Sequence, residues 1–511
     1  MQMHKDSAQM KHATFAEPSA KHEPMNLNLH QVLAWLQADE ELQARMMGSP
    51  NRALQFDRVH TDTRTLVSGD LFVALKGEKY NANSFLEQAK HMGAKAAICE
   101  HGLQAMNWLG IEVSDTAKAL GVLAASWRRD LDVQVIAVTG SNGKTTVTQM
   151  LASILRAWQG EKSLATEGNF NNAVGVPLTL LRMRNSHRCA VLELGMNHPG
   201  EIIELAQWVQ PQVALVNNAQ REHQEFMGSV KAVAIENAQV FKALSPEGVA
   251  VFPMDDEHSD LWTGMAGKAK VCRFGKNEKA DVQLLKSEWA DGAWTLDVKV
   301  ALQTFAFTLN LPGEHNVHNA LASTACAYSL GVPMAMVQKG LADFQAVQGR
   351  SSFKALRVKA FNAQLGQEQE HHIGLVDDSY NANPDSVIAA IDLLARLEGP
   401  RVLVLGDMGE VGEHGVMFHE EVGRYASQVG IDHLMGLGPL TQHAVKAFEQ
   451  KQSRDQRAEH FEAIEPLIKT LSEQLPEFKS LLIKGSRFMK MERVVEALLR
   501  QSMAKEDITC S

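Results

Sequence analysis

Residues 139–146 read TGSNGKTT, a string whose residue types suit the binding of phosphate groups. Glycines allow the backbone to approach a phosphate closely, the lysine places a cation at the β and γ phosphates, and the first threonine suits Mg²⁺. A strand before the string and a helix after it would aim backbone N–H groups at the phosphates. We therefore predict an ATP-binding loop formed by Gly140, Ser141, Asn142, Gly143, Lys144, Thr145 and Thr146.

The loop is a variant of the general phosphate-loop pattern. That pattern has a glycine five residues before Gly143, where this chain has Val138. The competing interpretation is an ordinary turn between a strand and a helix. The completeness of the remaining string makes this interpretation much the weaker one.

Two later residues are candidates for holding a metal ion. Glu193 ends an apolar segment, and the carboxyl ends of parallel strands meet at the ligand crevice of such sheets. Its carboxylate is a ligand that Mg²⁺ accepts, as is the hydroxyl of Thr145. His223 follows another apolar segment, but an isolated histidine is more often structural or exposed. No Asn-Lys-x-Asp string follows the later strands, which argues against a regulatory GTPase.

The elements that must position these residues alternate between strand and helix. The apolar run at residues 134–140 is typical of a strand buried on both faces of a parallel sheet. Apolar residues at steps of three and four, from Val147 to Trp158, predict a helix after the loop. Residues 189–195 and 213–218 are further strand candidates, so the central part is predicted to be doubly wound. Alternating apolar residues between 289 and 311 predict antiparallel strands added to that sheet.

The same alternation on both sides of the central part predicts a chain of three α/β domains. With 511 residues the chain is too long for one hydrophobic core. Short apolar segments at 71–75 and 96–99 indicate a small N-terminal domain, and those at 373–380, 401–407 and 481–486 indicate a Rossmann-like C-terminal one. The predicted parts are a flexible tail (1–24), a small α/β domain (25–130), a central ATP-binding domain (131–346) and a C-terminal domain (347–511).

Composition excludes several classes of partner. The net charge is −10 and charges of both signs are mixed, so no basic stripe could neutralise a nucleic-acid backbone. The five cysteines have no close spacing, which favours a reducing compartment over a disulfide framework or a zinc site. No apolar run reaches the roughly 18 residues of a membrane span or the pattern of a signal peptide. We expect a cytoplasmic protein without nucleic-acid or membrane partners.

Several further strings, taken with the phosphate loop, resemble the Mur ligases, bacterial enzymes of cell-wall synthesis, from about residue 30 onward. Singly, such Asn-rich and Gly-rich strings are often only turns, but their shared order and spacing favour the family. The strings are TEGNFNNAVGVPLTLL (166–181), ELGMNHPGEI (193–202), GEHNVHNALAS (313–323), GR (349–350), DDSYNANPDS (377–386), LGDMGEVG (405–412) and KGSRFMKME (484–492).

The resemblance implies roles for individual residues. Lys144 would contact the ATP phosphates, Thr145 and Glu193 one Mg²⁺, and His223 a second one. Arg350 would bring positive charge to the transferred phosphate. Asn316 and Asn319 would face adenine, while Asp378 and Tyr380 would lie near the nucleoside. A uridine-diphosphate pocket in the N-terminal domain would include Asp62, Thr63 and Arg64, and the peptidyl substrate would lie against Thr166, Asn169, Asn171 and Asn172.

The resemblance also implies a reaction. The DDSYNANP and KGSRFMKME strings are similar to those of the family member that adds D-alanyl-D-alanine to UDP-N-acetylmuramoyl-tripeptide through an acyl phosphate, at the expense of ATP with Mg²⁺. We expect a monomeric enzyme. The alternatives are another ligase of the superfamily, such as a folylpolyglutamate-type enzyme, and a nucleotide-binding scaffold of the same fold that has lost ligation.

One position departs from the family pattern. Many relatives carry a carbamylated lysine in the helix after the histidine, and its negative charge helps to hold the second Mg²⁺. This chain has Asn237 there, which cannot be carbamylated and offers only a neutral oxygen. We therefore predict that Asn237 contributes to catalysis as a direct or water-mediated ligand of the metal, with nearby carboxylates such as Glu225 supplying charge.

Overall fold

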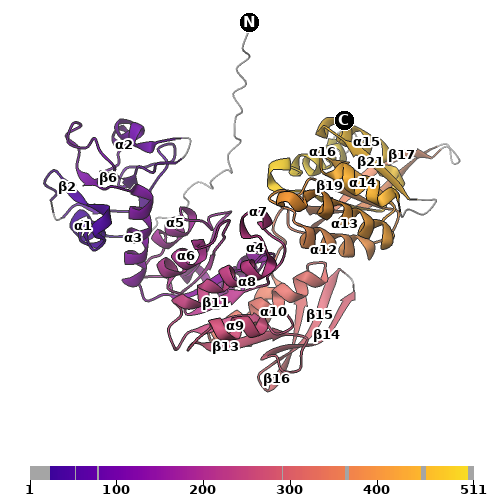
Figure 1. Ribbon diagram of the computed structural model, residues 1–511, viewed down its shortest axis with the longest axis horizontal. Helices are drawn as coiled ribbons and strands as arrows, with labels where there is room; N and C mark the ends of the chain where they lie inside the picture. Colours follow the sequence, from indigo (N-terminus) through magenta and orange to yellow (C-terminus); the bar gives the residue numbers. More distant parts are fainter. Residues whose placement is uncertain are drawn as a thin grey trace, which may run out of the picture. The chain divides into compact units, whose positions relative to one another are not determined.

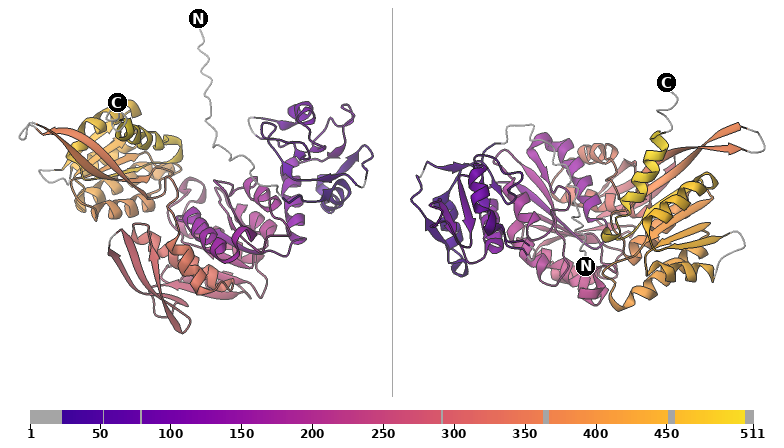
Figure 2. Two further views of the ribbon diagram at one scale, coloured as in Figure 1. Left: turned by 180° about the vertical axis from the view of Figure 1, so that it is seen from behind. Right: turned by 90° about the horizontal axis from the view of Figure 1, so that it is seen from above.

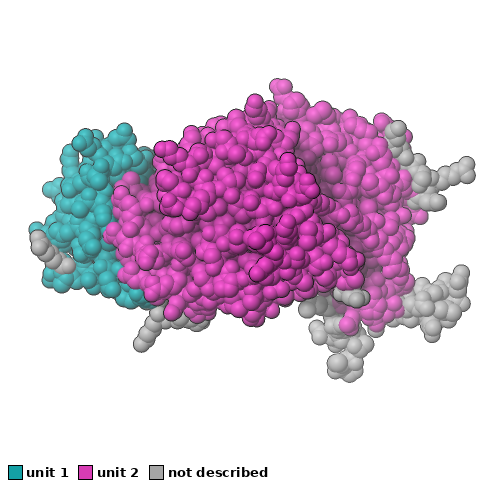
Figure 3. Space-filling view, turned by 90° about the horizontal axis from the view of Figure 1, so that it is seen from below, with its two compact units in different colours: residues 1–119 teal, residues 120–511 magenta. Residues whose placement is uncertain are grey.

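The computed structural model describes residues 23–504, apart from residues 52, 78–79, 291, 363–366 and 451–455. All but the last two residues of the predicted tail, 1–24, lie outside the described residues. The chain forms two compact units, Met1–Ala119 and Leu120–Ser511, which are coloured separately in Figure 3. The predicted boundaries at residues 130 and 346 stay predictions.

The first unit contains a small mixed sheet. Its five strands lie in the order β2-β7-β6-β5-β4, parallel except for β2 against β7, and β1 pairs separately with β3. Asn28 begins the first helix with a capping box, because its side chain accepts hydrogen bonds from the backbone N–H groups of His30 and Gln31. The elements are β1 (Leu27–Asn28), α1 (Leu29–Gln37), β2 (Arg45–Met47), β3 (Gln55–Phe56), β4 (Val59–His60), β5 (Leu71–Val73), α2 (Leu86–His91), β6 (Ala96–Cys99), β7 (Gly110–Glu112) and α3 (Thr116–Arg129), which crosses into the second unit.

A nine-stranded sheet begins the second unit, in the order β16-β15-β14-β13-β12-β11-β8-β10-β9. It is parallel from β9 to β14, and β15 and β16 are added antiparallel, as the alternating sequence predicted. Its strands are β8 (Gln134–Thr139), β9 (Ser163–Ala165), β10 (Cys189–Glu193), β11 (Val213–Val216), β12 (Val249–Pro253), β13 (Lys270–Gly275), β14 (Val282–Ala290), β15 (Ala293–Val300) and β16 (Gln303–Leu309).

Helices cover this sheet, and the helix after the phosphate loop buries much of its surface. The apolar stripe predicted from Val147 onward packs with α10 and α11 against one face, in a core that includes Ile136 and Val138. A Cβ atom on Gly340 of α11 would lie 2.4 Å from the Cα of Ile154, so that glycine permits the close approach of α11 to α4. The helices are α4 (Lys144–Gln159), α5 (Gly175–Leu181), α6 (Glu201–Val209), α7 (Gln224–Met227), α8 (Val230–Asn237), α9 (Ser259–Met265), α10 (Glu314–Ser329) and α11 (Met334–Ala342).

A six-stranded sheet follows, in the order β17-β18-β22-β19-β20-β21, parallel except for β17. Alternate residues of its strands enter two separate cores, Leu403 one and Val404 the other, so both faces are covered by helices (Figure 1, Figure 2). The elements are β17 (Ser352–Asn362), β18 (Gln367–Asp378), α12 (Pro384–Ala395), β19 (Arg401–Gly406), α13 (Gly415–Gln428), β20 (His433–Leu437), α14 (Thr441–Glu449), β21 (Arg457–Phe461), α15 (Ile464–Gln474), β22 (Ser480–Lys484) and α16 (Glu492–Ala504).

The predicted α/β class, with a doubly wound central part and a Rossmann-like C-terminal part, is confirmed. In the part of the chain that the structure describes, no helix has both the length and the apolar character needed to cross a membrane.

Candidate active site

The register of three parallel strands brings the predicted nucleotide-binding residues to one edge of the nine-stranded sheet. Val138 of β8 lies beside Glu193 of β10, and Thr139 lies beside Val216 of β11. The phosphate loop leaves β8 at this edge and enters α4. A cavity of about 1270 Å³ opens here, between these strand ends and those of the six-stranded sheet in the same unit.

Most residues predicted from the sequence line this cavity. The lining includes Ser141, Asn142, Gly143, Lys144, Thr145, Thr146, Asn169, Asn171, Asn172, Glu193, His223, Asn316, Asn319, Arg350, Asp378 and Tyr380. The lining does not include Gly140, Thr166 and Asn237, whose contacts are described below. Asp62, Thr63 and Arg64 belong to the other compact unit.

The two glycines of the phosphate loop are required by its backbone. Gly140 and Gly143 have φ angles of 124° and 82°, in the region that favours glycine. A Cβ atom on Gly143 would lie 2.3 Å from Oδ1 of Asn319, and one on Gly140 would lie 2.9 Å from the backbone nitrogen of Asn217. Any other residue at either position would therefore displace the loop.

Lys144 folds back onto its own loop. Its ammonium group donates hydrogen bonds to the carbonyl oxygens of Gly140, at 2.6 Å, and Ser141, at 3.0 Å. The same group lies 3.3 Å from Oε2 of Glu222, a buried carboxylate that the sequence analysis did not identify. The lysine is thus held by the acceptors that ATP phosphates would replace.

Hydrogen bonds between asparagines hold the loop in place. Asn142 exchanges side-chain hydrogen bonds with Asn383, which precedes α12, and Asn217 donates to Asn319 at 3.0 Å. The Asn319 amide donates in turn to Oδ1 of Asn316. Asn316 and Asn319, predicted to face adenine, therefore lie beside the loop in a hydrogen-bonded row.

Only one of the two carboxylate oxygens of Glu193 has a hydrogen-bond partner. Its side chain is 2% exposed, and Oε1 accepts a hydrogen bond of 2.8 Å from the amide of Asn171. Its backbone N–H donates to the hydroxyl of Thr166. Oε2 is buried without a hydrogen-bond partner. An unpaired buried carboxylate oxygen in the cavity wall fits a hard cation such as Mg²⁺.

The segment predicted to line the peptidyl substrate therefore has several structural tasks. Asn171 and Thr166 support Glu193, while Oδ1 of Asn172 accepts from the backbone N–H groups of Val174 and Gly175. Asn169 contributes to the cavity wall without such a contact among the described hydrogen bonds. Of the four predicted residues, Asn169, Asn171 and Asn172 line the cavity and Thr166 does not.

His223 lies between two carboxylates. Its Nε2 lies 3.9 Å from Oε2 of Glu222, and its Nδ1 lies 2.5 Å from Oε2 of Glu410, which follows β19. The close contact with His223 holds the pKa of Glu410 below its usual value, although partial burial opposes this shift. No group of three His, Cys, Asp or Glu side chains in the described chain forms a complete metal site, so any ion here needs further ligands.

Asn237 does not face this histidine. Its side chain is 1% exposed, Oδ1 accepts a hydrogen bond of 2.8 Å from the backbone N–H of Gly140, and Nδ2 donates to the carbonyl of Val233. It does not line the cavity. The role of Asn237 as a direct or water-mediated ligand stays a prediction, and in this geometry both amide groups have partners and the oxygen anchors the phosphate loop. Glu225 is exposed and also lies outside the cavity wall.

The opposite wall comes from the residues around the six-stranded sheet. The guanidinium of Arg350 lies 4.2 Å from the ring centre of Tyr380. Asp378 binds the ammonium of Lys484 at 2.5 Å and the backbone N–H of Ser351 at 2.9 Å. Burial alone would raise the pKa of Asp378, but the charge of Lys484 and these hydrogen bonds outweigh it and lower the pKa.

Arg221 joins the two walls and was missed in the sequence. Its guanidinium lies 2.7 Å from a carboxylate oxygen of Asp385 and 2.7 Å from one of Glu421, above the ring of Phe418. Two partners more than 160 positions away in the chain leave no local pattern, so no sequence signal marks this arginine.

The residues predicted for a uridine-diphosphate pocket pair with each other. Asp62 accepts hydrogen bonds from the backbone and the guanidinium of Arg64, and this contact lowers the pKa of Asp62. Thr63 lies between them in the turn after β4. Such a local pair is compatible with a ligand site and with an ordinary turn.

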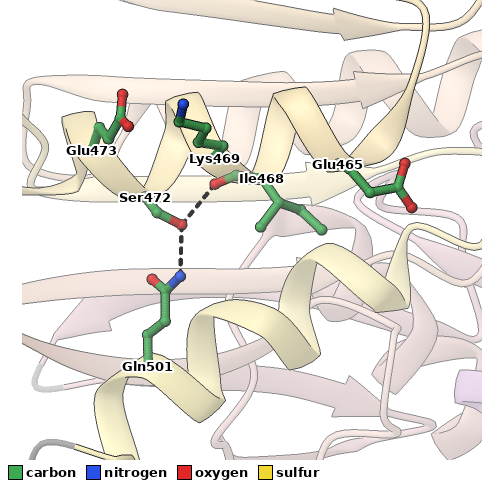
Figure 4. A pocket seen from close by; sticks show the side chains of 6 residues that line it. All are labelled: Glu465, Ile468, Lys469, Ser472, Glu473 and Gln501. Atoms are coloured by element: carbon green, nitrogen blue, oxygen red, sulfur yellow. Dashed lines mark hydrogen bonds between the residues drawn. The ribbon is translucent and has the colours of Figure 1, made fainter.

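A second, smaller hollow lies between α15 and α16 (Figure 4). Gln501 donates a hydrogen bond to Ser472, which donates to the carbonyl of Ile468. Its volume is about 500 Å³, and its other lining residues are Glu465, Lys469 and Glu473. No residue predicted for the site lies in this hollow, so the chemistry belongs to the larger cavity.

Comparison with known proteins matches three segments of the chain to one family. The descriptions are "Mur ligase family, catalytic domain" for residues 55–128, "Mur ligase middle domain" for 138–327 and "Mur ligase, glutamate ligase domain" for 364–487. The UDP-N-acetylmuramoyl-tripeptide–D-alanyl-D-alanine ligase of Haemophilus influenzae is 36% identical over 482 residues, which cover 94% of this chain and 99% of that protein. The Escherichia coli ligase of the same name is 38% identical over 448 residues, covering 87% and 94% of the two chains. This chain belongs to the Mur ligase family.

Solved structures agree with this assignment. MurF from Acinetobacter baumannii has a TM-score of 0.81 and 32% identity, with 94% of this chain and all of that chain covered. MurF ligase from Thermotoga maritima in complex with ADP has a TM-score of 0.74 and 26% identity, covering 88% and 98%. As a Mur ligase, the chain is an ATP-dependent, ADP-forming amide ligase, which confirms ATP as the nucleotide.

Proposed function

We propose that this Mur ligase joins D-alanyl-D-alanine to UDP-N-acetylmuramoyl-tripeptide in the synthesis of peptidoglycan precursors. The observation that carries this proposal is the 36% identity to the Haemophilus ligase over 94% of the chain, because it spans every part that would hold a substrate. Since the reaction consumes ATP, we place the enzyme in the cytoplasm. We propose that it acts as a monomer.

The reaction needs no nucleophilic side chain. An oxygen of the tripeptide's terminal carboxylate attacks the γ-phosphorus of ATP, and ADP leaves. The amine nitrogen of D-alanyl-D-alanine then attacks the acyl carbon of the acyl phosphate, inorganic phosphate leaves and the nitrogen loses a proton. Such a reaction depends on positioning and on neutralising charge around the phosphoryl group. Lys144 and Arg350, on opposite walls of the cavity, bring two of the required positive charges.

Mg²⁺ is part of the proposal. Thr145 and Glu193 would hold it beside the phosphates, and the unpaired Oε2 of Glu193 supports this assignment. The ion would neutralise charge on the β and γ phosphates during transfer. His223 is the candidate for a second ion.

The remaining assignments follow the order of the domains. We propose that residues 25–130, with Asp62, Thr63 and Arg64, bind the uridine-diphosphate part, and that residues 131–346 bind ATP. The muramoyl peptide would lie along Asn169, Asn171 and Asn172, while Asp378 and Tyr380 of residues 347–511 would contact the nucleoside. Enclosure of the cavity during turnover would protect the acyl phosphate from water.

The deciding experiment measures ADP release with each substrate omitted in turn. We expect release to require both UDP-N-acetylmuramoyl-tripeptide and D-alanyl-D-alanine. Turnover with a shorter muramoyl peptide and a single amino acid, or with a folate and glutamate, would instead identify another ligase of the superfamily. ATP binding without turnover on any substrate pair would favour the scaffold alternative. Tripeptides ending in diaminopimelate or lysine should be compared in the same assay.

A further inference from the structure

Glu222 has the features of a ligand-binding residue that has not been assigned a role. Its side chain is 7% exposed and lines the large cavity. One oxygen, Oε2, lies 3.3 Å from the ammonium of Lys144, while the other, Oε1, is buried with no hydrogen-bond partner. A buried carboxylate with one free oxygen is costly unless a cation or donor arrives to satisfy it.

The neighbouring histidine is already oriented for a cation. Nδ1 of His223 lies 2.5 Å from a carboxylate oxygen of Glu410, and Nε2 lies on the side of Glu222, 3.9 Å from its Oε2. A carboxylate that holds the far nitrogen of a histidine is the usual support of a metal-binding imidazole. Both His223 and Glu410 have left-handed backbones, with φ of 47° and 57°, a strained state that clusters at functional sites.

The anionic charge that a second cation needs must come from some residue. Asn237 cannot supply it, since its amide is neutral and holds Gly140 and Val233. Glu225, the carboxylate favoured by the sequence, is exposed outside the cavity wall. Glu222 is the remaining carboxylate beside His223 on this loop, and it is buried.

We propose that Glu222 and His223 together bind a second divalent cation when ATP occupies the cavity, with Glu410 positioning the imidazole. Without nucleotide, Glu222 neutralises Lys144. When ATP binds, its phosphates replace Glu222 as the partner of Lys144. The carboxylate of Glu222 can then bind the cation, so nucleotide and cation bind together. This inference rests on the proposed ATP-dependent chemistry, but not on the identity of the peptide substrate.

The test counts Mn²⁺ ions bound to the full chain by electron paramagnetic resonance, with the protein saturated by a non-hydrolysable ATP analogue. We expect two ions in the wild type. Glu222→Gln keeps the shape of the side chain and should weaken one site by at least about 10- to 100-fold, the loss typical of residues that only support a metal ligand. Glu193→Gln should weaken the other. Glu225→Gln, three positions further on in α7, is the matched control and should bind as the wild type does.

Three results would overturn the proposal: a single ion in the wild type, two ions of wild-type affinity in Glu222→Gln, or loss of an ion in Glu225→Gln. If Glu222→Gln changes only the affinity for the analogue, Glu222 serves Lys144 alone and the proposal also fails. Glu222→Asp, which keeps the charge, should retain part of the affinity if the carboxylate is a ligand.

Glu410→Gln tests the positioning role separately. It should weaken the same site as Glu222→Gln, and the two changes combined should add little, because both act on one ion. Unchanged Mn²⁺ affinity would remove Glu410 from the proposal. No acceptor peptide or D-alanyl-D-alanine is present in these titrations, so their outcome is independent of whether the proposed ligation is observed.

Discussion

The polar residues that end or directly follow strands of the two large sheets differ in how completely they are bonded. At the end of the nine-stranded sheet, Glu193, Asn217 and Glu222 each keep a buried oxygen without a hydrogen-bond partner. At the end of the six-stranded sheet, Asp378 and Asp407 both bind several partners. We therefore expect cations to act at the nine-stranded sheet, where bonding capacity is unmet, while the bonded carboxylates of the six-stranded sheet hold the opposite wall of the cavity in place.

The largest expected effect is at the reactive end. Lys144→Ala should lower kcat for ligation by about 10²- to 10³-fold or more, the loss typical for a charge that stabilises a transition state. The fold should persist, because the side chain is bonded only to its own loop and to Glu222. Steady-state kinetics and far-ultraviolet circular dichroism check both parts. Near-normal turnover in the folded variant would refute the phosphate-loop assignment.

Glu193→Gln should separate activity from stability. We expect kcat to fall by about 10²-fold, whereas Tm should stay unchanged or rise, because the change removes a buried charge that lacks a full set of partners. Calorimetry and the ligation assay measure the two quantities. A Tm lower by many degrees, with turnover retained, would show that Glu193 is structural.

The bonded end should respond in the opposite way. Asp407 is buried, and its carboxylate accepts hydrogen bonds from the backbone N–H groups of Leu440 and Thr441 at the start of α14. Asp407→Ala should lower the free energy of unfolding by about 1 to 3 kcal/mol, as expected for lost bonds to a charged cap. Urea unfolding with analogue-binding affinity as a second readout tests this. Equal stability of the variant and the wild type would contradict the contrast between the sheets.

A smaller effect is expected on the free energy of unfolding at low pH. Because its contact with Lys484 outweighs burial and lowers the folded-state pKa of Asp378, its ionised form stabilises the fold. That contribution is present above the unfolded value of about 3.9 and is lost as pH falls below it, toward the lowered folded pKa. The difference in unfolding free energy between wild type and Asp378→Asn should therefore shrink between pH 5 and 3. A difference that grows on acidification would reverse the assigned sign.

The last prediction is that bicarbonate has no effect on the rate of ligation. Since Asn237 cannot be carbamylated and is bonded to Gly140 and Val233, ligation in degassed, bicarbonate-depleted buffer should match that in buffer with added bicarbonate. The comparison should be made at several Mg²⁺ concentrations. Clear stimulation by bicarbonate would mean that a lysine elsewhere carries a carbamate.

The sequence predicted what local patterns encode. The phosphate loop was predicted because its residue types recur at fixed spacing between an apolar strand and an amphipathic helix, and Glu193 because it ends a strand beside that loop. Glu222 and Arg221 were missed, since their partners lie at distant positions and a charged residue in a loop has no periodic signal. The sequence pointed to Asn237 as a departure from the family pattern, and only the fold shows that its amide is bonded to Gly140.

The strand order of the nine-stranded sheet also bears on how the chain is assembled during its synthesis. From β12 to β16 every new strand pairs with the one translated just before it, while β11 pairs with β8, and β10 lies between β8 and β9. No interior strand of this sheet therefore depends on a partner strand from the C-terminal part of the chain. Because domains generally form as units as the chain emerges, the nucleotide-binding edge could be assembled on the ribosome before the six-stranded sheet has been translated.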